Sequence, residues 1–406
     1  MKKILIWLLV FCILVATGCN GSKKTGSKDS SSNSKTNVKL EMSAEQKDIV
    51  RINNYATTPA ERVSSDKYRL VTFDEYWDYS HHPTIAMFKG EIVVAYASGH
   101  NGENNVGQRV MVSKSNGFNN WTTPKAVVDT RKGYYNNIHS YPIGLYDNGE
   151  ELVLYYGSGE YTPDCLTKEG ERPTSGAKTL WSGIFYKTSK DGINWSEEFK
   201  VNITGSFIAS PMKTKTGRLI MPSAESFAYT DDAKGLTGWK RNQVDPTLVK
   251  EAQQEGNVDL SESSFYVLDD NTIFLLCRTG TQYLYAAKST DNGMTWSKPF
   301  ATSFSDNGSR FAFNRLNDGR YIYVGTPNTK GFRSPLMLCL SENGFDFDKQ
   351  FILGDAEYYM IKKPGFAKDG VYGYPAMCFD DEYLYVAYSL GKEAFEVARV
   401  KLSDLK

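Results

Sequence analysis

The sequence has little of what many fold and function classes require. It holds only four histidines, and its cysteines show no CxxC or Cys/His spacing, which gives no support for a zinc site. Convincing amphipathic helices are absent. The 47 basic and 47 acidic residues cancel, so the overall charge does not favour nucleic-acid binding. What remains is a chain of 406 residues rich in Tyr, Phe and Gly, a composition typical of all-β proteins.

The N-terminus reads as a targeting segment. Two lysines precede the apolar run ILIWLLVFCILVA (4–16), which is short for a membrane span, and Ala-Thr-Gly leads directly into Cys19. This arrangement resembles the lipobox of bacterial lipoproteins, and the resemblance implies cleavage before Cys19 and lipidation of its sulfur. An ordinary signal peptide and a short transmembrane anchor are the alternatives.

The chain therefore divides into three predicted parts. Residues 1–18 are a signal peptide, and residues 19–44 are a disordered, lipidated tether rich in Ser, Lys and Gly. Residues 45–406 form the folded domain. We expect it to be a monomer held outside the cytoplasm on the cell membrane or outer membrane.

The remaining cysteines are expected to be free thiols. Cys277, Cys339 and Cys378 lie in apolar, strand-like runs, and Cys165 lies in a loop. Burial without a partner is the usual state of such thiols.

A short turn motif recurs four times along the chain. In the segment STDNGMTWS (289–297), Asp and Asn bond their own backbone, Gly supplies a positive φ, and Trp anchors the turn on a sheet. Similar segments are SKSNGFNNW (113–121), TSKDGINW (188–195) and LSENGFDF (340–347). We interpret these turns as structural elements of a repeated β-unit and not as catalytic ones.

The recurring turns belong to a second, longer repeat of β-hairpins. Six pairs of short strand-like runs, each around a tight turn, start roughly 50–70 residues apart. They cover residues 82–99, 141–159, 210–224, 262–280, 311–327 and 374–389. Regular alternation of hairpins and turns predicts an all-β, six-bladed β-propeller with Asp-box turns, in preference to a long β-sandwich or a β-helix.

In a propeller the first strand of each blade lines the central channel, and the strand ends at one mouth form the site. All four histidines and several charged residues fall at these positions. The set comprises His81, His82, His100, His139 to Tyr141, Ser210, Glu262, Arg278, Arg310, Phe311 and Tyr374. Such a gathering of His, Glu, Arg and Tyr indicates chemistry more than packing.

The Asp-box turn on a six-bladed propeller resembles the sialidase (neuraminidase) superfamily over about residues 68–406. Glu262-Ser263-Ser264 followed by Arg278 is similar to the sialidase segment that supplies the catalytic Glu and one carboxylate-binding Arg. Arg333 resembles a second such Arg, and Gly373-Tyr374 resembles the segment with the nucleophile. The resemblance implies Tyr374 as nucleophile, Glu262 as its base, and Arg278 and Arg333 as a clamp on the sugar carboxylate.

The sequence departs from the family at three points. Sialidases open their first blade with Arg-Ile-Pro, where this chain has His81-His82-Pro83. Gly99-His100 stands in place of the usual Gly-Arg. The loop that normally holds the acid/base Asp is NGENNVGQR (101–109), in which Glu103 is the only carboxylic acid. We therefore expect Glu103 as the acid, and His81, His82, His100 and His139 as contacts to the sugar.

These residues predict a glycoside hydrolase that removes a terminal acidic sugar, sialic acid or a related carboxylated sugar, by a retaining mechanism. A hydrolase or lyase acting on uronic-acid polysaccharide, with His81, His82, His139 and Tyr374 as proton carriers, is the first alternative. A non-catalytic glycan-binding propeller is the second. No organic cofactor and no catalytic metal are implied, although Asx-rich turns could hold a structural Ca²⁺.

Overall fold

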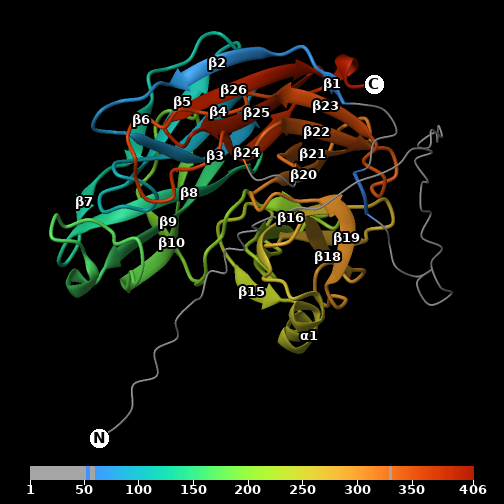
Figure 1. Cartoon of the computed structure of the whole chain (residues 1–406), viewed down its shortest axis with the longest axis horizontal. Helices are drawn as coiled ribbons and strands as arrows, with labels where there is room; N and C mark the ends of the chain where they lie inside the picture. The colour runs from blue at the N-terminus through green and yellow to red at the C-terminus, as the bar shows by residue number, and fades with distance from the viewer. Residues whose placement is uncertain (1–51, 55–59, 329–331) are drawn as a thin grey trace, which may run out of the picture. The chain divides into compact units, whose positions relative to one another are not determined.

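The computed structural model of the chain describes residues 52–54, 60–328 and 332–406, which belong to one compact unit, residues 50–406 (Figure 1). The predicted signal peptide, Cys19 and the tether lie outside the described residues and remain predictions. Among the helices of the described part, none is long and apolar enough to cross a membrane.

Six sheets, antiparallel apart from the short strand β1, form a six-bladed β-propeller, as predicted. The first three blades follow one another along the chain. Blade 1 contains β3 (Tyr79–Phe88), β4 (Glu91–Gly99), β5 (Arg109–Ser115) and β6 (Lys125–Val128). Blade 2 contains β7 (Arg131–Lys132), β8 (Asn137–Asp147), β9 (Leu152–Tyr161), β10 (Thr179–Ser189) and β11 (Phe199–Val201). Blade 3 contains β12 (Met212–Lys213), β13 (Leu219–Pro222), β14 (Ser226–Thr230) and β15 (Lys240–Gln243).

The N-terminal strands complete the last two blades. Blade 4 contains β16 (Ser261–Val267), β17 (Ile273–Arg278), β18 (Tyr283–Ser289) and β19 (Phe300–Ser305). Blade 5 contains β20 (Ala312–Arg315), β21 (Tyr321–Gly325), β22 (Leu336–Ser341) and β23 (Lys349–Gly354), with β1 (Glu61–Arg62) added in parallel to β23. Blade 6 contains β24 (Tyr372–Phe379), β25 (Tyr383–Leu390) and β26 (Ala394–Lys401), with β2 (Asp66–Val71) antiparallel to β26. The first and last parts of the propeller are thereby hydrogen-bonded to each other.

Each of the six hairpins predicted from the sequence forms two neighbouring, paired strands of one blade. They are the pairs β3–β4, β8–β9, β12–β13, β16–β17, β20–β21 and β24–β25. In Figure 1 the labelled strands β3, β8, β16, β20 and β24 lie toward the middle of the molecule, and β2, β15 and β19 lie further out. In a propeller the strands nearest the axis line the central channel.

The recurring turns connect β5 to β6, β10 to β11, β18 to β19 and β22 to β23. In the turn between β18 and β19, the Asp291 carboxylate accepts hydrogen bonds from the backbone of Met294 and Thr295, and Ser289 Oγ accepts one from Gly293 N. The Trp296 ring packs on Phe227 of blade 3 and on Phe265. The turns are structural, as predicted, because they fasten one blade onto the preceding one.

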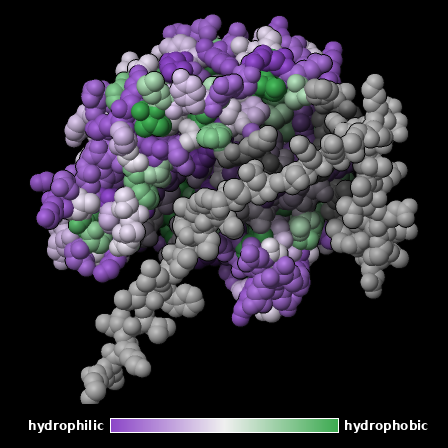
Figure 2. All heavy atoms as spheres, in the orientation of Figure 1, coloured by the Kyte–Doolittle hydropathy of each residue, from purple (hydrophilic) through white to green (hydrophobic). Residues whose placement is uncertain are grey.

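One helix corrects the prediction that helices are absent. Helix α1 (Pro246–Gly256) lies between blades 3 and 4 and starts at Asp245, whose side chain accepts a hydrogen bond from Thr247 N. Pro246 at its first position suits a helix N-terminus. Only Val249 and Ala252 are buried, and the face turned to solvent is hydrophilic (Figure 2). The described residues also form two short 3₁₀ turns, η2 (Pro163–Cys165) and η3 (Leu402–Asp404).

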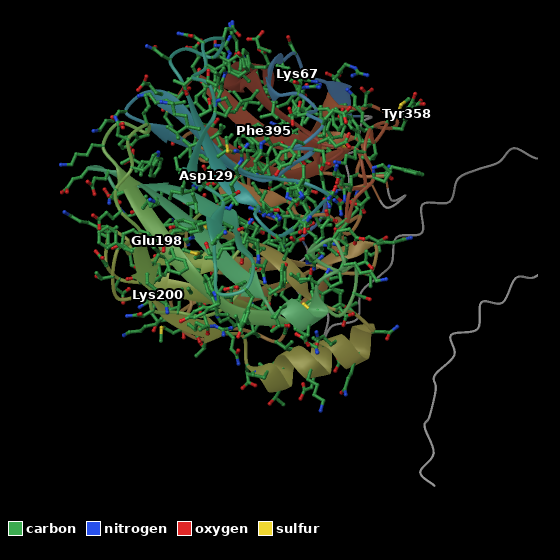
Figure 3. The ribbon with its side chains drawn as sticks, turned by 90° about the vertical axis from the view of Figure 1, so that its left-hand side faces the viewer. Lys67, Asp129, Glu198, Lys200, Tyr358 and Phe395 are labelled. Carbon is green, nitrogen blue, oxygen red and sulfur yellow. The ribbon has the colours of Figure 1, made fainter. Side chains whose placement is uncertain are left out.

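The hydrophobic core is divided among the interfaces between neighbouring blades. One cluster, for example, joins Ile85 and Tyr96 of blade 1 to Tyr385 and Phe395 of blade 6. Phe395 is buried, whereas Lys67, Asp129 and Lys200 are exposed (Figure 3). Because every blade shares its apolar residues with the next, we expect the blades to support one another rather than fold singly.

The cysteines of the described residues form no disulfide. Cys277 and Cys339 are buried free thiols, as predicted, and Cys165 and Cys378 are partly exposed.

Candidate active site

Four of the six inner strands carry a β-bulge at the place where the predicted site residues lie. The pairing register shifts between His81 and Thr84 in β3, Pro142 and Gly144 in β8, Ser261 and Ser263 in β16, and Gly373 and Ala376 in β24. A bulge bends the strand and turns a side chain out of the regular alternation. These bulges direct His82, Glu262 and Tyr374 toward the mouth of the channel.

The backbone at these bulges adopts a conformation that bulky residues rarely take. His82 has a φ of 53° and Tyr374 has a φ of 48°, and each directly precedes a proline. Arg333 and Lys392 also have positive φ, at 51° and 56°. Each such residue costs on the order of 1–3 kcal/mol, and strain of this kind concentrates at functional sites.

Tyr374 stands at the centre of a dense group of aromatic and basic side chains. Its ring lies 4.3 Å from the His81 ring and 5.6 Å from the His82 ring, centroid to centroid. The guanidinium groups of Arg310 and Arg333 each lie 5.7 Å from its centroid. Burial, followed by the negative charges of Glu262 and Glu103, raises the pKa of the Tyr374 phenol. The Tyr374 hydroxyl is therefore neutral at physiological pH and needs a base to become a nucleophile.

Close packing explains why a glycine precedes Tyr374. A Cβ at Gly373 would lie 2.5 Å from Ser389 Oγ and 2.8 Å from the His81 ring. The His81 Nδ1 also shares a 2.7 Å hydrogen bond with Ser389 Oγ. Any side chain at position 373 would therefore displace the histidine that packs on Tyr374.

Glu262 and Arg278 form a pair on one side of the site. Arg278 Nη1 donates a 2.5 Å hydrogen bond to Glu262 Oε2, and both side chains are largely buried. Burial opposes the charge of Arg278, but the carboxylate of Glu262 and the oxygen of Tyr374 raise its pKa overall. Arg278 thus stays charged between the predicted base and the predicted nucleophile.

Glu103 contacts two side chains, those of His82 and Lys392. Its Oε1 is 3.3 Å from His82 Nε2, and its Oε2 is 3.5 Å from Lys392 Nζ. Burial alone would raise the pKa of Glu103, but His82 and Lys392 outweigh it and lower the pKa to about 2. Glu103 is therefore ionised at any physiological pH.

Two of the histidines are held neutral. Burial, assisted by Lys392, lowers the pKa of the fully buried His81 well below its usual range. Burial and then the charge of Arg172 lower the pKa of His139 to about 4. The His139 ring stacks on Tyr161 at 4.5 Å, and its Nδ1 is buried without a hydrogen bond.

A cavity of about 460 Å³ opens beside these groups. This volume falls in the range of small-molecule sites. The side chains that line it with polar atoms are those of His82, Glu103, Asn104, His139, Tyr141, Ser158, Tyr161, Arg172, Thr179, Ser182, Ser206 and Glu262. The cavity is thus bounded by the two carboxylic acids predicted from the sequence and by a wall from blade 2.

The structure does not place every predicted residue together. The predicted residues that do not line this cavity are His81, His100, Arg278, Arg333 and Tyr374. The His100 ring packs on Tyr76 and Trp77. Arg333 lies beside Tyr374 and 3.5 Å from Asp369 Oδ1.

Three basic residues of the site had no role assigned from sequence. Arg310 lies just before β20, and this position in the sequence indicated that it belongs to the mouth of the channel. Arg172 comes from the long loop between β9 and β10, where its guanidinium packs 3.9 Å from the Phe366 ring and Nε donates to Tyr161 Oη. Lys392 comes from the turn between β25 and β26. Neither Arg172 nor Lys392 belongs to a sequence motif that could have indicated it.

A buried ionic network supports the loops around Glu103 and Lys392. Lys368 Nζ lies 2.9 Å from Asp78 Oδ1 and 3.3 Å from Glu393 Oε1, and all three side chains are fully buried. Glu393 also accepts hydrogen bonds from the backbone of Lys362 and Lys363. Within the described ranges, no group of three or more His, Cys, Asp or Glu side chains could hold a metal ion.

The family model of the BNR repeat-like domain matches residues 90–386. The chain belongs to the BNR repeat-like domain family. No curated protein matches the chain.

Solved structures share the fold of this BNR domain at low sequence identity. A sialidase is 17% identical with a TM-score of 0.63 over 87% of this chain, which spans 35% of that sialidase. The intramolecular trans-sialidase of Ruminococcus gnavus is 15% identical with a TM-score of 0.60, covering 84% of this chain and 98% of its own. A protein of unknown function from Dyadobacter fermentans is 19% identical with a TM-score of 0.58, covering 84% of this chain and 100% of its own. These similarities establish a sialidase-like fold.

Proposed function

We propose that this BNR propeller is a retaining glycoside hydrolase that removes a terminal carboxylated sugar, such as sialic acid, from glycans. The observation that carries the proposal is the setting of Tyr374, a neutral phenol between Glu262 and the guanidinium groups of Arg278, Arg310 and Arg333. Guanidinium groups bind a carboxylate bidentately and remain charged. A neutral nucleophile approaches an anionic sugar without charge repulsion.

The proposed reaction has two steps. Tyr374 Oη attacks the anomeric carbon as its phenolic proton passes to Glu262, while the bond to the aglycone oxygen breaks and that oxygen takes a proton from a general acid of the site. Water then attacks the same carbon and gives a proton back to that acid/base group, and Tyr374 leaves and regains its proton from Glu262. The basic residues hold the sugar carboxylate through both steps. Two displacements at one carbon retain its configuration.

The test is proton NMR of the full chain mixed with a simple aryl α-sialoside. We expect release of free sialic acid with the α anomer appearing first. Appearance of the β anomer first would contradict the retaining mechanism. Glu262→Gln should abolish release while the sialoside still produces binding-dependent line broadening. If wild type and Glu262→Gln both bind sialosides and neither releases sugar, the propeller is a glycan-binding module.

The histidines in place of the first-blade arginine support a second candidate, a lyase for uronic-acid polysaccharide. His81 is neutral and lies against Tyr374, so the pair could exchange a proton with a sugar carbon next to a carboxylate. Elimination creates a double bond, so its product shows a vinyl proton in the same NMR experiment. A vinyl signal with uronic-acid oligosaccharides, and no reaction with sialosides, would favour this candidate.

A further inference from the structure

The hydrolysis proposed above needs a group that gives a proton to the departing oxygen. The cavity offers two carboxylic acids, Glu262 and Glu103. Glu262 is engaged with Arg278, on the side of the nucleophile. Glu103 is the acid expected from the sequence, but with a pKa of about 2 it has no proton to give. Neither carboxyl group therefore meets the need.

The neighbouring His82 combines position, a negative partner and a free nitrogen. Its ring lines the cavity and lies 5.6 Å from the ring of Tyr374. Its Nε2 is buried, lies 3.3 Å from Glu103 Oε1 and makes no hydrogen bond within the described residues. We assign Nδ1, the other ring nitrogen, as the one that faces a substrate. The left-handed backbone of His82 and the bulge in β3 hold the ring in this orientation. A carboxylate beside an imidazole stabilises its protonated form and fixes which nitrogen carries the mobile proton.

The groups around His82 come from several blades. The His81 ring lies 4.8 Å away, the Tyr141 ring lies 6.0 Å away, and both belong to groups that are neutral at physiological pH. Lys392 reaches the same carboxylate from the turn before β26 and competes for its charge. Glu103 is thus the one anion of the described residues in contact with His82, and it is shared with a lysine.

We propose that His82, supported by Glu103, is the general acid and base of this site in place of the carboxylic acid that sialidases use. The inference rests on the proposed hydrolase function. In the first step the His82 Nδ1–H bond breaks as the proton passes to the aglycone oxygen, while the C–O bond breaks and Tyr374 Oη bonds to the anomeric carbon. In the second step neutral His82 takes a proton from the attacking water, which restores the imidazolium. Glu103 is a positioning residue that keeps its charge throughout.

The test compares two substrates that differ in their leaving group. Nitrophenolate leaves as a stable anion without a proton, whereas the lactose of a sialyllactose must be protonated. For His82→Asn we expect kcat/KM to fall by about 100-fold or more with sialyllactose, the usual size of a general-acid contribution. With the nitrophenyl sialoside the fall should be only a few-fold. Equal losses on both substrates would mean that His82 only binds the sugar, and no loss on either would also overturn the inference.

A second measurement tests the role of Glu103 without relying on activity. Because Glu103 lies against the His82 ring, the NMR signals of that ring in the full chain should shift in Glu103→Gln relative to wild type. The matched control is Glu91→Gln, which removes a carboxylate paired with Lys114 at the other end of blade 1 and should change neither the His82 signals nor the kinetics. Unchanged His82 ring signals in Glu103→Gln would overturn the dyad. A wild-type protein that cleaves neither substrate would instead remove the proposed function, and the inference with it.

Discussion

The two ends of the blades differ in how their polar groups are hydrogen-bonded. At the end with the Asp-box turns, polar groups are satisfied by near neighbours: Asp291 binds backbone N–H groups three and four residues ahead. At the end with the cavity, bulky residues adopt positive φ, and buried polar atoms of His81 and His139 lack hydrogen-bond partners. One end is built for stability, and the other holds strain and unpaired polarity that a bound glycan could relieve.

The two ends of the blades differ in which residues stabilise them. The turn end is stabilised locally and needs little from the rest of the chain. The cavity end depends on distant partners, such as the buried contact of Lys368 with Asp78 and Glu393. Substitutions at the turn end should therefore change stability alone, and those at the cavity end should change activity, stability or its pH dependence.

The largest effect is expected for a pair of tyrosines, one at each end. Tyr374→Phe removes the nucleophilic oxygen, so kcat should fall by about 10⁴-fold, roughly 5 kcal/mol in the barrier. Tyr266→Phe removes a buried hydrogen bond to Gly344 O at the turn end and should cost about 1–2 kcal/mol of stability with unchanged kcat. Steady-state kinetics and urea denaturation of both variants test the pair. Full turnover by Tyr374→Phe would contradict the mechanism.

Lys368→Met tests the buried ionic network. It leaves the carboxylates of Asp78 and Glu393 without this buried cation, so the free energy of unfolding should fall by about 3–5 kcal/mol. Lys363→Met is the control, since its side chain is more than one-third exposed and its ion pair with Asp78 should contribute less than about 1 kcal/mol. Equal losses in denaturant titrations of the two variants would show that burial does not set the cost.

Glu103 should give the cavity end a pH dependence that the turn end lacks. Its pKa is about 2 in the folded protein against an ordinary 4.5, so the carboxylate stabilises the fold above pH 4.5. That contribution is lost as the pH falls from 4.5 toward 2, and could reach about 3 kcal/mol. Urea denaturation from pH 6 to pH 3 should therefore give a steeper loss for wild type than for Glu103→Gln. Parallel profiles would mean that Glu103 is not held in its ionised form.

The smallest effect is expected within the turns themselves. Asp291→Ala removes the acceptor of two backbone N–H groups and should cost about 1–2 kcal/mol with no change in kcat. The matched control is Asn116→Ala in the first turn, where the exposed Asn116 side chain makes no hydrogen bond within the described residues, and its cost should stay under about 0.5 kcal/mol. A loss of activity in Asp291→Ala would contradict the prediction that substitutions at the turn end change stability alone.

The sequence predicted correctly the features that depend on residues close together in the chain. The hairpins and Asp-box turns were predictable because Gly, Asn and Asp specify turns within a few residues. Helix α1 was missed because only Val249 and Ala252 are buried, so it lacks a long apolar stripe despite the Asp245 cap. In the sequence, a helix N-cap followed by so few buried residues is hard to distinguish from a loop.

The candidate site was predictable only in part, because its contacts join distant residues. His81 and Ser389 meet across 308 positions, and Glu103 meets Lys392 across 289. The resemblance to sialidases predicted Tyr374, Glu262, Arg278 and Arg333 together, and the structure gathers them. No local pattern could have added Arg172 and Lys392, or kept His100 out, because their positions follow from how neighbouring blades meet.

The pairing of β2 with β26 has a consequence for the timing of folding. Asp66 and Arg399, which are joined by a hydrogen bond across these strands, lie 333 positions apart. At about 5–20 residues per second of synthesis, β2 must wait roughly 20–70 s for its partner to emerge. Until then its edge and that of blade 1 are open to other chains. The ring therefore closes last, and conditions that slow synthesis lengthen the interval in which the half-made protein is most vulnerable to aggregation.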